Sequence, residues 1–269
     1  MNPDANTPSP AAPLVLITGA SSGIGQALAQ AYLQRGWRVA LLARRTDVLA
    51  QWLHSLPLTL RADQTCILGA DVGDPDSMLA AAQQCMARMG LPDVVIANAG
   101  ISLGVDTAEH EDLAVFEQVL RTNTLGVAHT FHPFIRAMQA RGHGQLVGIA
   151  SVAGIRGLPG HAAYCASKAA VISYCESLRG ELRSQGVQVI TLAPGYIATP
   201  LTARNRYPMP FLMSAEAFAQ SALRSIERGD RYRVIPWPMA WVAKLLKVLP
   251  GALFDHLLKS QPRKHRHTE

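Results

Sequence analysis

A tyrosine and a lysine stand four residues apart in the stretch YCASK, as Tyr164 and Lys168. On a helix, side chains at this spacing lie on one face, one turn apart. A lysine ammonium lowers the pKa of a neighbouring phenol from about 10, because positive charge favours the phenolate. Such a pair can transfer protons near neutral pH. The spacing also occurs by chance, so its meaning depends on the elements that position it.

A glycine-rich segment, TGASSGIG from Thr18 to Gly25, follows an apolar run at 14–18 and opens a helical pattern. At a strand-to-helix junction of this kind, backbone amides and the helix N-terminus face an anion. Gly19 would permit the tight turn, Gly23 a close approach to a pyrophosphate, and Gly25 close packing of helix on sheet. The spacing is GxxxGxG rather than GxGxxG. We predict a dinucleotide site here, with a plain turn of small residues as the alternative.

The second apolar run ends in LLARR. An NAD site usually has an acidic residue at this point to bind the ribose 2′-hydroxyl. Ala43 stands there instead, followed by Arg44 and Arg45. No acidic side chain would repel a 2′-phosphate, and a guanidinium binds phosphate through two hydrogen bonds. We therefore predict that NADP(H) is preferred, with NAD(H) as the alternative cofactor and a solvated basic turn as the alternative interpretation of the arginines.

Short apolar runs alternate with helix-length segments along the chain. Runs that are apolar on consecutive residues are typical of strands buried on both faces. The predicted strands are 14–18, 38–43, 66–70, 93–98, 145–150, 187–193 and 232–236, and the predicted helices are 23–35, 46–56, 75–89, 111–140, 163–184 and 214–228. This order predicts an α/β fold of three layers, a Rossmann-type, doubly wound parallel sheet of about seven strands with helices on both faces.

The length of 269 residues fits a single α/β domain, which often runs to about 250 residues. We expect a disordered leader at 1–12, a catalytic domain at 13–236, and an apolar helical extension with a basic tail at 237–269. The leader lacks the basic and apolar regions of a signal peptide. The four cysteines show neither a CxxC pair nor zinc spacing, so we expect reduced thiols, no metal site and a cytoplasmic location.

The net charge of +6 is unevenly distributed. Residues 244–269 carry six Lys or Arg and two acidic residues, so +4 of the total lies in this segment and the rest of the chain is nearly neutral. We therefore expect no nucleic-acid partner. The basic end is interpreted as a solvated tail. The alternative interpretation is that it binds anionic lipid or nucleic acid.

Further motifs follow in order along the chain. ADV at 70–72 and NAG at 98–100 each follow a predicted strand, and PGYIATP occupies 194–200. Asn123 lies in RTNTLG, and Ser151 precedes Tyr164 by 13 residues. With the glycine turn and YxxxK, these motifs make the chain resemble the short-chain dehydrogenase/reductase family, in its branch of standard length, over about residues 13–236.

The resemblance implies roles for four side chains. Tyr164 would exchange a proton with a carbonyl oxygen while hydride is exchanged at the carbon, and Ser151 would stabilise the charge on that oxygen. Lys168 would lower the pKa of Tyr164 and bind the nicotinamide ribose. Asn123 would bend its helix and fix a water that links Lys168 to solvent. Taken singly, each of these residues could instead pack in the core, cap a helix or form part of a turn.

The resemblance also implies which residues contact the cofactor. They are Gly19, Ser21, Ser22, Gly23, Ile24, Gly25, Arg44, Asp71, Val72, Asn98, Ala99, Gly100, Tyr164, Lys168, Pro194, Gly195, Ile197 and Thr199. The expected function is an oxidoreductase that transfers hydride between NADP(H) and a carbonyl or secondary alcohol, as a carbonyl reductase or an alcohol dehydrogenase. The alternative is a cofactor-binding regulator without turnover. A homodimer or homotetramer is expected, formed through the helices that hold Asn123 and Tyr164.

Two apolar segments bear on the substrate and on partners. Met209, Phe211, Leu212 and Met213 favour an apolar or lipid-like substrate, although the loop could equally form a lid or a dimer contact. Residues 237–269 mix Trp, Leu and Lys, broken by Pro-Gly at 250–251 and too short to span a bilayer. They suit an interfacial amphipathic hairpin at the inner membrane face. The alternative is that they cover the pocket or extend a dimer interface.

Overall fold

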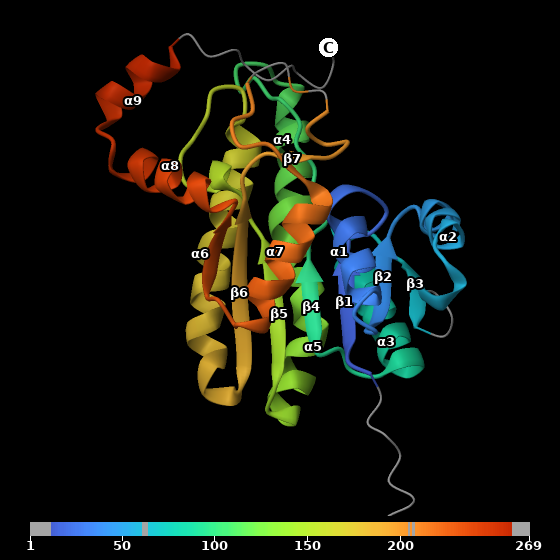
Figure 1. The fold of residues 1–269 in the computed structure, drawn as a ribbon. Helices are drawn as coiled ribbons and strands as arrows, with labels where there is room; N and C mark the ends of the chain where they lie inside the picture. The colour runs from blue at the N-terminus through green and yellow to red at the C-terminus, as the bar shows by residue number, and fades with distance from the viewer. Residues whose placement is uncertain (1–11, 61–63, 204, 206–207, 260–269) are drawn as a thin grey trace, which may run out of the picture.

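Parallel strands in the order β3-β2-β1-β4-β5-β6-β9 form the central sheet of the computed structural model, which describes residues 12–60, 64–203, 205 and 208–259 (Figure 1). Every strand predicted from the apolar runs is confirmed to within one residue at either end. The strands are β1 (Leu14–Thr18), β2 (Arg38–Ala43), β3 (Thr65–Gly69), β4 (Val94–Ala97), β5 (Gly144–Ile149), β6 (Val187–Pro194) and β9 (Tyr232–Ile235).

The strand order reverses beside β1, which pairs with β2 on one side and with β4 on the other. Leu16 of β1, for example, is in register with Ala40 of β2 and Val95 of β4. In open sheets of this kind, the crevice at the carboxyl ends of the strands beside such a reversal is where ligands bind. The glycine turn directly follows β1 and therefore lies at this crevice.

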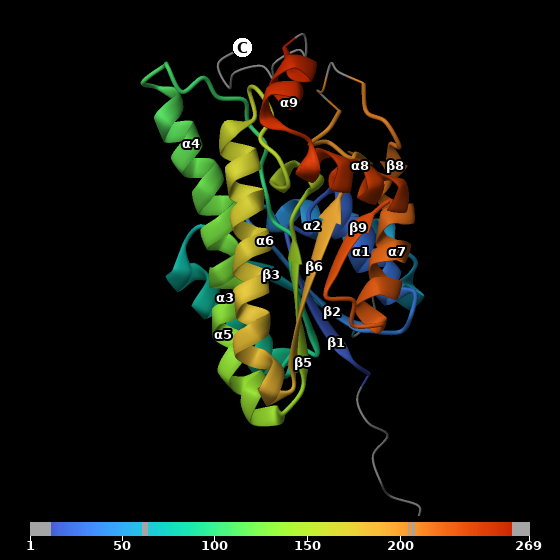
Figure 2. The same cartoon turned by 90° about the vertical axis from the view of Figure 1, so that its left-hand side faces the viewer.

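Helices cover both faces of the sheet, as Figure 2 shows from its edge. The helices α1 (Gly23–Leu33), α2 (Thr46–Ser55) and α7 (Ala215–Glu227) pack on one face. On the other face are α3 (Pro75–Met89), α5 (Gly126–Arg141) and α6 (Ala162–Leu182). The predicted three-layer, doubly wound parallel sheet is thus confirmed.

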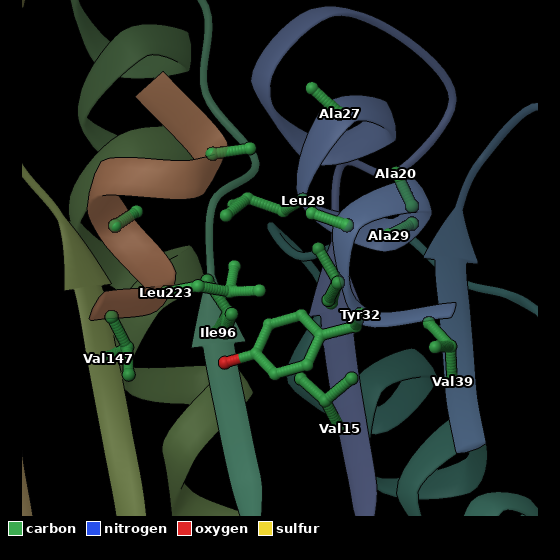
Figure 3. Packing of buried hydrophobic residues seen from close by; sticks show 14 of the residues in the cluster. Val15, Ala20, Ala27, Leu28, Ala29, Tyr32, Val39, Ile96, Val147 and Leu223 are labelled. Carbon is green, nitrogen blue, oxygen red and sulfur yellow. The ribbon is translucent and has the colours of Figure 1, made fainter. Parts of the chain in front are cut away.

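The side chains of β1 show why the strands are apolar at every position. Val15 and Ile17 face the α1 and α7 layer, whereas Leu14 and Leu16 face the α3 and α5 layer. Successive strand residues point to opposite faces, and here both faces are dry. Figure 3 shows the first layer, where Tyr32 of α1 and Leu223 of α7 lie over the sheet near Val15 and Ile96.

The helix predicted over 111–140 is divided in the structure. Helix α4 (Asp112–Leu120) ends in a π-helical turn, Arg121–Leu125, after which α5 begins. Single π turns inside α-helices recur at functional sites. The turn contains Asn123, where a local bend was expected, and its side chain is fully buried.

The chain beyond β6 adds elements that the strand pattern did not predict. Short strands β7 (Ile197–Ala198) and β8 (Met213–Ser214) pair and close the loop between them. Helices α8 (Trp237–Val248) and α9 (Gly251–Leu258) follow β9 and meet at Pro250, where the apolar segment was expected to break. Among the described helices, none is long and apolar enough to cross a membrane. Residues 1–11 of the predicted leader and 260–269 of the basic tail lie outside the described residues.

Candidate active site

One cavity at the carboxyl ends of the strands gathers most of the residues expected to contact cofactor or substrate. The glycine turn lines one part of it, and the segments after β2, β3, β4, β5 and β6 line the rest. Of the predicted residues, the cavity is lined by Gly19, Ser21, Ser22, Gly23, Ile24, Arg44, Asp71, Val72, Asn98, Ala99, Gly100, Ser151, Tyr164, Lys168, Pro194, Gly195, Ile197 and Thr199. Gly25 and Asn123 lie behind this lining.

Gly25 supports the glycine turn from behind, in agreement with the packing role predicted for it. A Cβ atom at this position would meet the carbonyl oxygen of Gly19 and the side-chain Nδ2 of Asn98, both closer than van der Waals contact allows. Gly19 and Gly23 have φ values of +65° and +55°, a region that side chains rarely adopt. The glycines are therefore required by the backbone path and by close approach.

Asn98 holds the same turn from the side of β4. Its Nδ2 donates hydrogen bonds to the carbonyl oxygens of Thr18 and Gly19, at 2.9 and 3.3 Å. The Thr18 hydroxyl accepts in return from the amides of Asn98 and Ala99, at 3.1 and 3.2 Å. Asn98 and Thr18 thus join the glycine turn to the NAG segment. Thr18 was not among the predicted site residues, although its place at the head of TGASSGIG was a usable signal.

Two arginines flank the part of the cavity beyond β2. Arg44 Nη1 lies 3.6 Å from Asp71 Oδ2, and both side chains are largely exposed. Arg45 Nη2 lies 3.5 Å from the hydroxyl of Ser21 in the glycine turn. Asp71 is further oriented by the amide of Gly73, which donates to Oδ1 at 2.9 Å. Arg45 belongs to the predicted basic turn with Arg44 but was not among the predicted cofactor contacts.

The proton-transfer candidates meet at the other end of the cavity. Ser151 lies two residues after the end of β5, Tyr164 lies in the first turn of α6, and Lys168 lies one turn later. Lys168 Nζ donates to the carbonyl oxygen of Ile149 at 2.8 Å and lies 6.0 Å from the centroid of the Tyr164 ring. The Ser151 hydroxyl also accepts a hydrogen bond from the Ala153 amide at 3.1 Å.

Burial dominates the protonation of this group. It lowers the pKa of Lys168 to about 8, because an ammonium is poorly solvated there. It raises the pKa of Tyr164 above the ordinary value for a phenol, and a hydrogen bond with Ser151 opposes that rise only in part. In this structure the Lys168 ammonium is directed to Ile149, and the raised pKa of Tyr164 follows from burial. The expected lowering of the Tyr164 pKa by Lys168 stays a prediction.

Asn123 links three segments from behind the cavity. Its Oδ1 accepts from the amide of Ile101 at 2.8 Å, and its Nδ2 donates to the Ile101 carbonyl oxygen at 2.9 Å and to Ser167 Oγ at 3.0 Å. It thereby fixes the π turn against the segment after β4 and against α6, which carries Tyr164 and Lys168. Ser167, which was not predicted, is the partner on α6.

Among its described residues, the loop between β7 and β8 lines the cavity only at its start. Pro200, Leu201 and Thr202 line it, whereas the apolar residues at 209–213 do not. Phe211 and Leu212 are exposed, and Met213 packs against the core on the α1 face. The apolar residues from which a lipid-like substrate was inferred are thus not part of the cavity wall.

Comparison with known proteins decides the family. The model of the family described as short chain dehydrogenase matches residues 13–209. The chain belongs to the short-chain dehydrogenase family. A protein of Myxococcus xanthus named as an uncharacterized oxidoreductase is 40% identical over 243 residues, which cover 89% of this chain and 94% of that protein. The Bos taurus dehydrogenase/reductase SDR family member 7B is 30% identical, over 94% of this chain and 82% of its own length.

Solved structures of short-chain dehydrogenases have the same fold. An alcohol dehydrogenase from Thermococcus sibiricus, solved with 5-hydroxy-NADP, matches with a TM-score of 0.73 and 25% identity, over 83% of this chain and 95% of its own. A short-chain dehydrogenase from Streptomyces avermitilis matches with a TM-score of 0.75 and 24% identity, over 92% of this chain and 96% of its own. The chain is therefore an oxidoreductase of the short-chain dehydrogenase family with a Rossmann-type fold.

Proposed function

We propose that this chain transfers hydride between NADP(H) and the carbon of a carbonyl or secondary alcohol. One observation carries the proposal. A single cavity holds the glycine turn and both arginines at one end, and Ser151, Tyr164 and Lys168 at the other. An extended dinucleotide can thus bind along one end while its nicotinamide reaches the proton-transfer groups.

The residues of this chain supply position and protons. The nicotinamide, when bound, supplies or accepts the hydride. Tyr164 transfers the proton to or from the substrate oxygen, since a phenol with a raised pKa remains protonated and ready to donate near neutral pH. Ser151 donates a hydrogen bond to the same oxygen. Lys168 binds the nicotinamide ribose and, when protonated, favours the phenolate that remains after the transfer.

The preference for NADP(H) is supported by charge at the β2 end of the cavity. Arg44 and Arg45 both line it, and Ala43 leaves no carboxylate at the end of β2. Arg44, now beside Asp71, and Arg45, now beside Ser21, would hold the 2′-phosphate of a bound NADP(H). The related Thermococcus sibiricus enzyme was solved with an NADP derivative, which agrees with this assignment.

The proposal extends to an apolar substrate and to a cytoplasmic location. Ile101, Ile197 and Leu201 contribute apolar walls to the cavity, which supports an apolar carbonyl compound or alcohol as the substrate. All four cysteines are free and buried, as is usual in a cytoplasmic protein.

The test measures oxidation of NADPH and NADH with a panel of aldehydes, cyclic ketones and long-chain ketones. We expect turnover with NADPH and at least one apolar carbonyl compound. In Tyr164→Phe, the Kd for NADPH should stay unchanged while kcat falls by roughly 10²- to 10⁴-fold, since the proton donor is lost and the ring remains. Near-normal kcat in that variant would rule out the mechanism. Tight NADPH binding without turnover of any panel member would identify a regulator instead.

A further inference from the structure

Helix α8 is attached to the body by one face only. Met239 and Ala243 are buried on that face, and Met239 packs with Ala193 of β6 and Val234 of β9. Met239 also contacts Gly195 so closely that a Cβ there would lie 2.9 Å from its side chain. The position of α8 beside the cavity is therefore set by a packed contact at the carboxyl ends of β6 and β9 (Figure 2).

The opposite face of α8 is apolar and exposed. Trp237, Trp241, Leu245 and Val248, which we call the α8 stripe, are exposed by 67%, 65%, 61% and 76%. Their spacing of four, four and three residues places them along one side of the helix. An exposed stripe with two tryptophans marks an interaction surface rather than scattered surface residues.

Basic residues border the α8 stripe. Lys244 is exposed beside the stripe, and its Nζ lies 4.9 Å from the centroid of the Trp241 ring. Lys247 is also exposed and lies one turn after Ala243, where both lysines line a hollow with Glu176 of α6. The sequence contains no acidic residue between Asp230 and Asp255. Tryptophan beside lysine suits a phospholipid surface, where the ring occupies the headgroup boundary and the ammonium meets anionic phosphates.

A side chain from the segment that follows Ser151 holds the C-terminal end of α8, and so fixes the orientation of the α8 stripe. Arg156, in the segment after Ser151, donates from Nη1 to the carbonyl oxygens of Leu246 and Leu249, each at 2.7 Å. Its guanidinium also lies 4.2 Å from the centroid of the Phe254 ring in α9. The end of α8 and the start of α9 are thereby held to the body by one side chain.

We propose that the α8 stripe docks this protein peripherally on an anionic lipid surface. A second copy of the chain is a poorer occupant, because a two-fold contact places each patch against the same patch of its partner. Lys244 and Lys247 would then face like charges, with no acidic residue of α8 to balance them. The proposal does not depend on the cofactor, the substrate or the proton-transfer mechanism.

The experiment is co-sedimentation of the full chain with vesicles of phosphatidylglycerol and phosphatidylcholine, and with phosphatidylcholine alone. We expect wild-type protein to sediment with the anionic vesicles at low salt and to be released by high salt. Leu245→Glu should lower the partition coefficient roughly tenfold or more, since it removes apolar contact and adds a repelled charge. Lys244→Gln with Lys247→Gln should remove the preference for anionic vesicles.

The matched control is Leu58→Glu, which makes the same change at a leucine that is 69% exposed on the α2–β3 connection. It should sediment like the wild type, and both variants should keep the wild-type circular dichroism spectrum. Wild-type protein that stays in the supernatant at low salt overturns the proposal, as does equal binding by Leu245→Glu. A fall in oligomer mass for Leu245→Glu by light scattering, without vesicle binding by the wild type, would assign the stripe to a subunit contact and also overturn it.

Discussion

Lys168 has its nitrogen 2.8 Å from the carbonyl oxygen of Ile149, and burial lowers its pKa to about 8. The YxxxK spacing correctly placed it one turn from Tyr164 on a helix and in the same cavity. The spacing could not give the direction of the Tyr164 pKa, because desolvation depends on the surrounding fold. For the same reason, the sequence did not reveal Ser167 as the partner of Asn123, whereas the place of Thr18 at the head of TGASSGIG was a usable signal for a role beside Asn98.

The shifted pKa of Lys168 makes stability depend on pH. Below pH 8 Lys168 is charged in both the folded and the unfolded protein, and the folded protein is destabilised by the buried charge. Between pH 8 and about 10.5 the unfolded state keeps a proton that the folded state has released, so the free energy of unfolding rises with pH. We expect the wild type to gain up to about 3 kcal/mol over this window relative to Lys168→Met.

Urea unfolding of both proteins at several pH values measures this difference. Titrations shared by the two proteins cancel in the comparison. Parallel profiles across the window would show that Lys168 has an ordinary pKa in the folded state.

Arg44 is the residue through which the proposed preference for NADP(H) can be tested most directly. Arg44→Ala should weaken NADPH by about 10- to 150-fold, or 1.5–3 kcal/mol, since a charge-assisted contact to the 2′-phosphate is lost. NADH should change little. Arg45→Ala, at the neighbouring position, should weaken NADPH as well if both guanidinium groups reach the phosphate. Isothermal titration with both cofactors measures these effects, and equal losses for NADPH and NADH would assign Arg44 another role.

At the scale of elements, the apolar runs predicted the seven strands well because the five inner strands are buried on both faces, whereas the edge strands β3 and β9 are buried only in part. The predicted helix at 111–140 shows where that reasoning stops. Its periodicity continues through Arg121–Leu125, yet the side chain of Asn123 bonds Ile101 and Ser167, and the helix adopts a π turn there. These partners are distant in sequence. The pairing of β7 with β8 was also beyond prediction, since each strand has two residues.

Arg156 connects the segment after Ser151 to the C-terminal helices, and this connection can be tested. Arg156→Met should leave two carbonyl oxygens without their donor and remove the contact with Phe254. We expect amide hydrogen exchange to accelerate over 237–258, while the sheet remains protected. Arg136→Met, at an exposed arginine of α5, is the matched control. Unchanged exchange in α8 and α9 would show that packing of Met239 alone holds the extension.

The whole molecule presents an exposed surface on the side of α4 and α6 (Figure 2). Leu113 of α4 and Leu125 of the π turn are about half exposed there. We predict at least a homodimer through this side, because these exposed apolar side chains at the two ends of the α4 segment are better buried by a partner. Light scattering at micromolar concentration should give at least twice the mass of the chain. Leu113→Glu should lower that mass, and Leu79→Glu on α3 should not. A monomer mass for the wild type would contradict the prediction.

The bonds between Asn98 and the glycine turn restrict how this chain can vary over evolutionary time. Asn98 Nδ2 satisfies the carbonyl oxygens of Thr18 and Gly19, and the same nitrogen lies where a Cβ at Gly25 would go. A substitution at Gly25 would therefore displace Asn98, and Asn98→Asp would place a carboxylate against two carbonyl oxygens. Segments almost 80 residues apart in the chain are thus under one joint constraint. In a deep mutational scan, substitutions at Gly25 and at Asn98 should therefore both reduce function. A substitution in one of the two segments should be tolerated only together with a compensating substitution in the other.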